Sequence, residues 1–234
     1  MAYQLDSNNP LISIPQKKLD SVIQSIEKDH ELSQKTKGLM IEAVTRYANS
    51  NIPVDYWYRE MTDFTGDRGL LKKYEEITSD MQRSYGHGVR ICFAGKHGTG
   101  KTMVACNVLK RAVEKGFSAL YITLTDVVTL MASNNVDGKY QARQSLLTVD
   151  FLVIDEFDPR FMGSNNAADL YGRILEPTLR TRIQNTLPTI LCTNSPNVLA
   201  GFSGSLQQSI SSLMSLVKTV PVLGSDYRSK QGNK

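Results

Sequence analysis

Five six-residue segments that are largely apolar recur along the chain, separated by longer stretches with helical spacing. They are rich in β-branched and aromatic residues, as buried strands are, and they cover residues 89–94, 118–123, 151–156, 189–194 and 218–223. Between the first two segments, Val104, Val108 and Ala112 fall on one face of a helix expected from Met103 to Lys115. The pattern predicts a core in which strands alternate with helices.

The first 50 residues carry helical spacing only. Apolar side chains recur every three to four residues in two stretches and predict helices over 17–31 and 36–49. We interpret the chain as a helical N-terminal region, a linker with a helix, and a core, with the bounds 1–50, 51–88 and 89–234. The N-terminal region is either a packing layer on the core or a docking surface for a partner protein.

The linker combines an aromatic cluster with a further helix. Pro53 ends the preceding helix, because the residue before a proline avoids the α region. The residues that follow, Val54 to Tyr58, include the only tryptophan, Trp57. They either pack beside a bound base or simply bury apolar surface. Apolar spacing from Leu70 to Tyr85 then predicts one helix that leads into the first strand.

The stretch between the second and third strands is less regular. A short helix is expected over 125–132, with Thr125 or Asp126 as its N-cap. Residues 134–144 are polar and form either an exposed loop or the start of another helix.

Residues 95–102 read G-K-H-G-T-G-K-T and match the Walker A pattern G-x-x-x-x-G-K-[ST] between a predicted strand and a predicted helix. Its glycines permit backbone conformations that let successive N–H groups and the helix N-terminus point at one anion. We predict that Lys101 reaches the β- and γ-phosphates of a nucleotide and Thr102 a Mg²⁺ ion. The predicted nucleotide contacts here are Gly95, Gly98, Thr99, Gly100, Lys101, Thr102 and Met103.

Two later strands end in polar residues suited to hydrolysis. Four apolar residues precede Asp155 and Glu156, which is the form of a Walker B strand. Asp155 is predicted to hold Mg²⁺ through its water shell, and Glu156 to polarise the attacking water. If the strand of residues 189–194 lies between the Walker A and Walker B strands, Asn194 helps to position that water. Otherwise Asn194 belongs to a turn with Ser195.

Composition places the chain among ordinary globular proteins, with 234 residues, 41% of them hydrophobic and 21% charged. The net charge of +4 permits nucleic-acid binding without arguing for it. No apolar run approaches the roughly 20 residues of a membrane-spanning helix, and no secretory signal is visible, so we expect a cytoplasmic protein without membrane contact. Three cysteines at apolar positions lack C-x-x-C spacing and are expected to be core residues.

In this order the motifs resemble the AAA+ ATPases of the DnaC-type helicase-loader group, which also contains the IstB-type transposition ATPases. The resemblance runs from about Ile52 to Arg228 through I-P-x-x-Y-W, G-K-H-G-T-G-K-T, L-V-I-D-E, P-T-I-L-C-T-N and D-Y-R. It implies an α/β P-loop fold in which helices flank a five-stranded parallel sheet. It also implies a small helical N-terminal domain and no sizeable C-terminal lid.

The resemblance further implies ATP and Mg²⁺ as cofactors and, as partners, a replicative hexameric DNA helicase and single-stranded DNA. Assembly would be as a homo-oligomer or bound to the helicase. The N-terminal helices would grip the helicase, and the helix over 125–132 would face DNA, with Lys139 and Arg143 nearby. Arg228 matches the terminal arginine of the family and either contacts phosphate or is a surface residue in a basic tail.

One departure from the family concerns the arginine finger, which usually lies on the helix before the last strand. Here residues 203–217 contain no arginine. Candidate replacements are Arg173, Arg180, Arg182 and Lys218; otherwise a partner supplies the finger or hydrolysis is slow. We therefore predict an ATPase that loads a replicative helicase onto DNA and is slow without partners. The alternatives are an IstB-like or TnsC-like transposition or DNA-targeting ATPase and an ATP-binding adaptor with little turnover.

Overall fold

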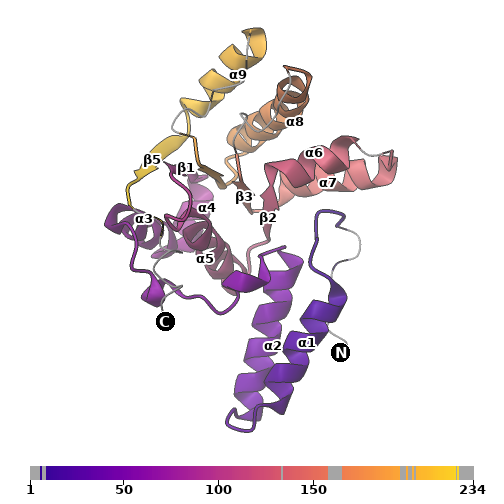
Figure 1. Cartoon of the computed structure of the whole chain (residues 1–234), viewed down its shortest axis with the longest axis vertical. Helices are drawn as coiled ribbons and strands as arrows, with labels where there is room; N and C mark the ends of the chain where they lie inside the picture. Colours follow the sequence, from indigo (N-terminus) through magenta and orange to yellow (C-terminus); the bar gives the residue numbers. More distant parts are fainter. Residues whose placement is uncertain are drawn as a thin grey trace.

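The computed structural model describes residues 6, 9–132, 134–157, 165–195, 199, 202, 204–224 and 226, with backbone alone for 132, 165–171 and 173. A parallel five-stranded sheet lies at the centre, in the order β2-β3-β4-β1-β5 (Figure 1). The strands are β1 (Arg90–Gly95), β2 (Ala119–Thr123), β3 (Phe151–Asp155), β4 (Thr189–Thr193) and β5 (Lys218–Val222). The predicted fold class is therefore confirmed, and β4 lies between β1 and β3 as the interpretation of Asn194 requires.

Strict alternation of side chains divides the core between the two faces of the sheet. Ile91 and Phe93 of β1 belong to one hydrophobic cluster and Cys92, between them, to the other. Helices that pack in the first cluster are α1 (Gln16–Lys28), α2 (Gln34–Asn49), α3 (Arg68–Thr78), α4 (Met81–Gly86) and α5 (Lys101–Glu114). Those of the second are α6 (Leu124–Ala132), α7 (Val136–Thr148), α8 (Asn165–Gln184) and α9 (Gly204–Met214). All three cysteines are buried and free, as expected.

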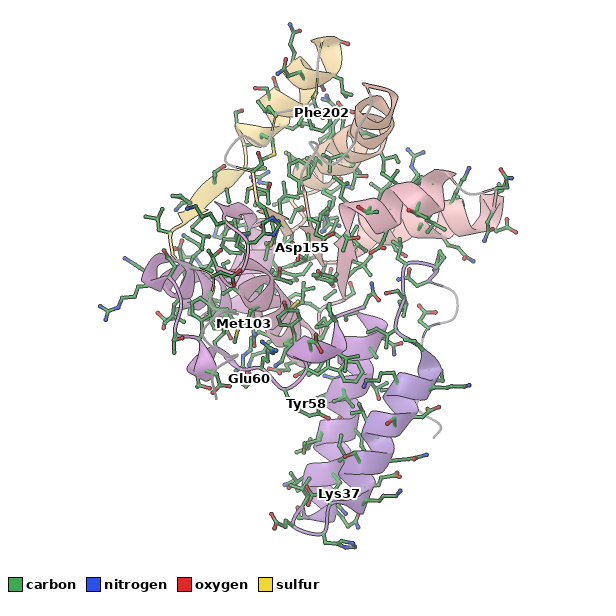
Figure 2. All side chains as sticks on the ribbon, in the orientation of Figure 1. Lys37, Tyr58, Glu60, Met103, Asp155 and Phe202 are labelled. Carbon is green, nitrogen blue, oxygen red and sulfur yellow. The ribbon has the colours of Figure 1, made fainter. Side chains whose placement is uncertain are left out.

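Helices α1 and α2 form an N-terminal hairpin that projects from one end of the core (Figure 1). The C-terminal end of α2 is tied to α5, since Tyr47 donates its hydroxyl hydrogen to Glu114 Oε1 over 2.8 Å. Arg46 also donates to the carbonyl of Val113 over 3.1 Å. Lys37 lies at the far end of the hairpin, well away from Asp155 (Figure 2). The hairpin is thus anchored to the Walker A helix at one end and extends outwards at the other.

Two local predictions were wrong and one open alternative is decided. The helix expected over 70–85 is two helices, α3 and α4, because Asp80 takes an extended conformation and caps α4 by accepting from the Arg83 N–H over 2.9 Å. The N-cap of α6 is Thr123, whose hydroxyl accepts from the Asp126 N–H over 3.1 Å. Residues 136–148 form the helix α7, so of the two alternatives for this stretch the helix is correct and the exposed loop is excluded. Across the described part of the chain, the helices are too short or too polar to span a membrane.

Candidate functional site

A cavity of about 500 Å³ opens at the carboxyl ends of β1, β3 and β4. In open α/β sheets, this is the edge at which ligands bind. The Walker A loop, the two acids after β3, and Asn194 all line it, together with parts of the linker. The predicted residues that line the cavity are Gly98, Thr99, Gly100, Lys101, Thr102, Met103, Asp155, Glu156 and Asn194.

Glycine is required at these loop positions for two different physical reasons. Gly98 and Gly100 have φ values of 71° and 91°, a region that side chains with a Cβ rarely adopt. Gly95 does not have a positive φ and does not line the cavity. A Cβ there would lie 2.4 Å from the carbonyl oxygen of Val222, so Gly95 is needed for the close approach of β5.

Lys101 is held at the centre of the loop. Its ammonium donates to the carbonyls of Gly95 and Lys96 over 2.8 and 2.6 Å, and it lies 3.3 Å from Thr99 Oγ1. The side chain is 5% exposed. A cation held by loop oxygen atoms at the start of α5 provides a fixed positive centre for a polyphosphate.

Asp155 and Thr102 form the oxygen pair expected of a Mg²⁺ site. Thr102 donates its hydroxyl hydrogen to Asp155 Oδ2 over 2.7 Å, which leaves the lone pairs of the hydroxyl oxygen available to a cation. Tyr121 of β2 donates to the same carboxylate oxygen over 2.9 Å. Hydroxyl and carboxylate oxygens are the hard ligands that Mg²⁺ prefers, so the residues present fit this ion.

Glu156 follows β3 directly and has φ 52°, a strained value for a residue other than glycine. Desolvation by the cavity walls, then the negative charges of Asp155 and Asp126, raise the pKa of Glu156 above its ordinary value. His97 in the Walker A loop acts in the opposite direction. A carboxylate with a raised pKa is a stronger base, as the activation of water requires.

Asn194 lies at the end of β4 and lines the same cavity as Glu156. The preceding Thr193 accepts from the Ser195 N–H through its hydroxyl over 3.0 Å. The sequence left two roles open for Asn194, a turn after β4 or an amide beside the nucleotide. The structure has both, because the turn forms and Asn194 lines the cavity.

One wall of the cavity comes from the linker and includes Tyr56, Arg59 and Phe64. Trp57 is not part of it: the indole is 2% exposed and donates to the carbonyl of Ile52 over 2.7 Å. Of the two interpretations of the aromatic cluster, burial holds for Trp57, while Tyr56 is a side chain that a base can reach.

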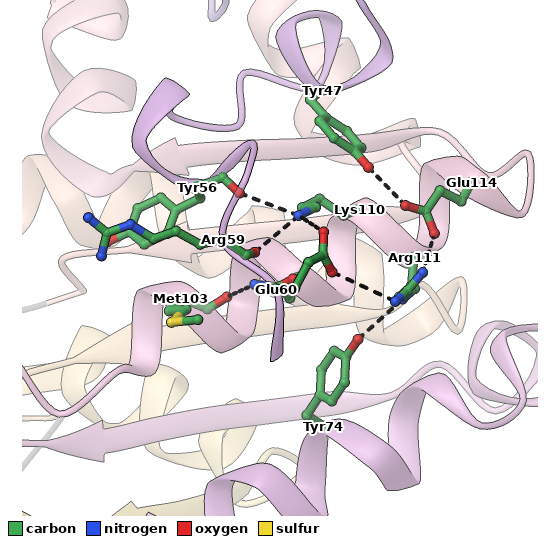
Figure 3. A network of polar contacts seen from close by, with 10 residues as sticks. Tyr47, Tyr56, Arg59, Glu60, Tyr74, Met103, Lys110, Arg111 and Glu114 are labelled. Atoms are coloured by element: carbon green, nitrogen blue, oxygen red, sulfur yellow. Dashed lines mark hydrogen bonds and ion pairs between the residues drawn. The ribbon is translucent and has the colours of Figure 1, made fainter. Parts of the chain in front are cut away.

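Lys110 holds this wall in place (Figure 3). Its ammonium is 2.6 Å from Glu60 Oε1 and 3.1 Å from the carbonyl oxygen of Arg59, with the carbonyl of Tyr56 at 3.5 Å. It also lies 5.3 Å from the ring centre of Tyr47 on α2. Lys110 is 1% exposed, so these contacts provide the neutralisation that a buried cation needs.

The candidates for an arginine finger differ in how exposed their side chains are. Arg182 is fully buried, and its five N–H donors are all satisfied by carbonyl or hydroxyl oxygens of Leu146, Val149, Asp150, Pro188 and Thr189. Its candidacy was wrong, because a side chain committed to these partners cannot reach a neighbouring subunit. Arg180 is exposed on α8 beside Glu176, and Lys218 is exposed at the start of β5. The side chain of Arg173 and all of Arg228 lie outside the described residues.

Sequence reasoning missed Tyr121, Phe64 and Lys110. Tyr121 could have been found from the sequence. It lies two residues before the end of β2, the strand next to β3, and its side chain is on the same face of the sheet as Asp155. Lys110 carried a weaker one, as a charged residue among the apolar positions of the Walker A helix. Phe64 lies in a linker segment without periodicity, so nothing in the sequence pointed to it.

Comparison with known sequences finds one matching family and a similar curated protein. The family described as IstB-like ATP binding protein matches residues 84–196. The replicative helicase loader DnaC of Escherichia coli (strain K12) is 30% identical over 133 residues, which is 56% of this chain and 51% of the loader. The chain therefore spans about half the length of this curated relative.

Two solved structures show the same fold. That of DnaI has a TM-score of 0.60 at 14% identity and covers 74% of this chain and 93% of DnaI. That of AMPPCP-bound DnaA from Aquifex aeolicus has a TM-score of 0.55 at 20% identity and covers 77% of this chain and 54% of DnaA.

Proposed function

We propose that this chain, which is similar to the DnaC-type helicase loaders and to the IstB-like ATP-binding proteins, is an AAA+ ATPase of that group. In this proposal it binds ATP with Mg²⁺ and hydrolyses it to control a DNA helicase. The observation that carries the nucleotide chemistry is the presence of Lys101, Asp155, Glu156 and Asn194 around one cavity. A triphosphate in that cavity has a cation, a metal site and a base within reach.

Each residue has a distinct role in the proposed reaction. The N–H groups of the Walker A loop and the Lys101 ammonium bind the β- and γ-phosphates. Thr102 and Asp155 would hold Mg²⁺, which neutralises charge on the transferred phosphoryl group. Glu156 accepts a proton from the attacking water, and Asn194 orients that water by hydrogen bonding. Tyr56 and Phe64 offer aromatic surface to the base.

The helicase-loading role is supported by the DnaC relative and by the position of the N-terminal hairpin. The hairpin extends away from the sheet and bears Leu39, whose side chain is 59% exposed on α2. An exposed leucine on a projecting helix suits docking onto an apolar groove of a partner. We assign the helicase contact to this hairpin.

We assign the contact with single-stranded DNA to α7, which follows α6. Arg143 and Tyr140 are exposed there and Lys139 is half-buried, so the helix offers two cations and an aromatic ring. Cations bind the phosphate backbone and aromatic rings stack on bases, the combination used for single strands. The interpretation as a DNA-targeting ATPase of the transposition type is kept as the second candidate, because the model of the IstB-like family matches residues 84–196.

The test is ATP hydrolysis by the full chain alone and with single-stranded DNA, duplex DNA or a hexameric replicative helicase added separately. Stimulation by single-stranded DNA or by the helicase supports the loader. Stimulation by duplex DNA alone favours the transposition-type ATPase. Absence of turnover in every condition, with ATP binding retained, identifies an adaptor.

The variant Glu156→Gln separates chemistry from binding in the same assay. It keeps the shape of the side chain but removes the base, so we expect ATP affinity to be retained and the rate to fall about 10²–10⁴-fold. Lys101→Ala is the matched control for binding and is expected to abolish nucleotide affinity. A normal rate in Glu156→Gln would show that another group activates the water.

A further inference from the structure

Tyr121 connects two parts of the molecule that the proposed reaction leaves separate. Its hydroxyl donates to Asp155 Oδ2 over 2.9 Å at the edge of the cavity. Its backbone N–H donates to the carbonyl of Ser50 over 2.8 Å, and its carbonyl accepts from Asn51 Nδ2 over 3.0 Å. Ser50 and Asn51 directly follow α2, so one residue contacts both Asp155, the proposed metal ligand, and the end of the N-terminal hairpin.

The main chain of Tyr121 is fixed from both sides. β2 is an edge strand of the sheet, paired with β3 along one side. Ser50 and Asn51 bond to its other side, where an edge strand otherwise exposes its backbone groups. Asn51 is itself 4% exposed and has φ 53°, a conformation that asparagine tolerates better than most residues. The backbone of Tyr121 is therefore held in place, which restricts the positions that its ring can take.

The contact of Tyr121 with Asp155 is compatible with a bound metal. Asp155 Oδ2 also accepts from Thr102, and Oδ1 accepts from the Glu156 N–H over 2.7 Å. A carboxylate offers about four acceptor positions, so these three bonds leave one for a metal-bound water. Asp155 is 6% exposed, and few other donors can replace the tyrosine hydroxyl there.

We propose that Tyr121 is a positioning residue of the Mg²⁺ site, whose hydroxyl holds the Asp155 carboxylate in the orientation that the metal requires. This inference rests on the proposed function, since it needs ATP and Mg²⁺ to bind in the cavity. Partners that orient metal ligands in this way typically change metal affinity by 10- to 100-fold when removed. Phosphate binding by Lys101 and the Walker A backbone does not involve Tyr121 and stays as it is.

The variant Tyr121→Phe tests the proposal, because it removes one hydroxyl and keeps the buried ring. The affinity of the full chain for the non-hydrolysable analogue AMPPCP is measured by calorimetry, once in EDTA and once in excess Mg²⁺. The expected result is a loss of about tenfold in Mg²⁺ and unchanged affinity in EDTA. Tyr85→Phe, at a half-buried tyrosine of α4 that does not line the cavity, is the matched control and is expected to behave as the wild type.

Two results would overturn the inference. One is an equal affinity of Tyr121→Phe and wild type in Mg²⁺, and the other is an equal loss in EDTA and in Mg²⁺, which indicates a general structural role. A wild-type chain that binds AMPPCP with no dependence on Mg²⁺ would instead remove the metal site from the proposed function, and this inference with it.

Discussion

Glu156 and His97 line the same cavity, and His97 affects the pKa of Glu156. The pKa of Glu156 is raised by desolvation and by Asp155 and Asp126, whereas His97 lowers it. A base must be ionised to act, so hydrolysis falls as the pH falls through this raised pKa. Removing His97 takes away the interaction that lowers this pKa, so the pKa of Glu156 rises further.

We therefore expect His97→Gln to move the acid limb of the rate profile to higher pH by a fraction of a pH unit. The measurement is kcat as a function of pH under saturating ATP. The control is His87→Gln, because His87 lines a separate cavity beside α4, and we expect this variant to leave the profile unchanged. An acid limb that stays in place in His97→Gln would show that another group titrates.

Arg182 contributes to stability instead of catalysis. Its guanidinium joins the end of α7, the start of β3 and the start of β4 through five hydrogen bonds. Lysine keeps the charge but has three donors on a single atom, so at least two buried acceptors lose their partner. Each loss costs about 1–3 kcal/mol, and we expect Arg182→Lys to lower the free energy of unfolding by about 2–4 kcal/mol.

Urea denaturation measures this effect. Arg180→Lys, two residues earlier on the same helix and exposed, is expected to stay within about 0.5 kcal/mol of the wild type. Similar values for the two variants would contradict the structural role of Arg182.

The nucleotide motif was readable from the sequence because its chemistry depends on residue type and spacing. Lys101, Thr102, Asp155 and Glu156 are adjacent to strand ends, and parallel strands bring those ends together. Whether an arginine is exposed or buried depends on its neighbours in space. Arg182 contacts residues on three other segments, so its burial had no local signature.

Helices and strands were predictable as far as hydrophobic periodicity reached. Each strand was found within two residues. For β1 to β4 the reason is that side chains buried on both faces leave continuous apolar runs, whereas most of β5 is exposed and its prediction depended on two valines. The break between α3 and α4 was missed, since the apolar spacing continues through it and the capping by Asp80 competes with a continuous helix. The cap at Thr123 was missed for a similar reason, because that residue is also the last residue of β2.

The Walker A helix α5 has a second role in its C-terminal half. Through Lys110 it fixes residues 56–60, and through Arg111 and Glu114 it contacts Tyr74 of α3 and Tyr47 of α2 (Figure 3). The linker wall of the cavity thus depends on a helix whose first turn binds phosphate.

We expect Lys110→Met to weaken ATP binding about tenfold, because the wall bearing Tyr56 loses its buried anchor. Binding of inorganic triphosphate, which has no base, stays unchanged because Lys101 is untouched. Calorimetry with both ligands measures the two effects. Lys115→Met, exposed at the end of the same helix, is the control. An equal loss for both ligands would place the defect in the loop and not in the wall.

The proposed partner surfaces lie on different parts of the chain. The N-terminal hairpin projects at one end, and α6 and α7 lie on the opposite face of the sheet from α5 (Figure 1). The hairpin is connected to the cavity through Tyr47, which lies beside Lys110, and through Tyr121, which bonds both to Ser50 and Asn51 after α2 and to Asp155. This arrangement allows ATP to influence a helicase and DNA at separate sites.

Leu39 tests the assignment of the helicase to the hairpin. A charge at this position has no cost in the free chain, because the side chain is 59% exposed, but it is costly in an apolar interface. We expect Leu39→Glu to reduce binding of a hexameric replicative helicase at least tenfold while ATP affinity stays unchanged. The control is Leu216→Glu, which changes a leucine that is 55% exposed after α9. Equal loss of helicase binding in both variants, measured by surface plasmon resonance, would show that the hairpin is not the docking surface.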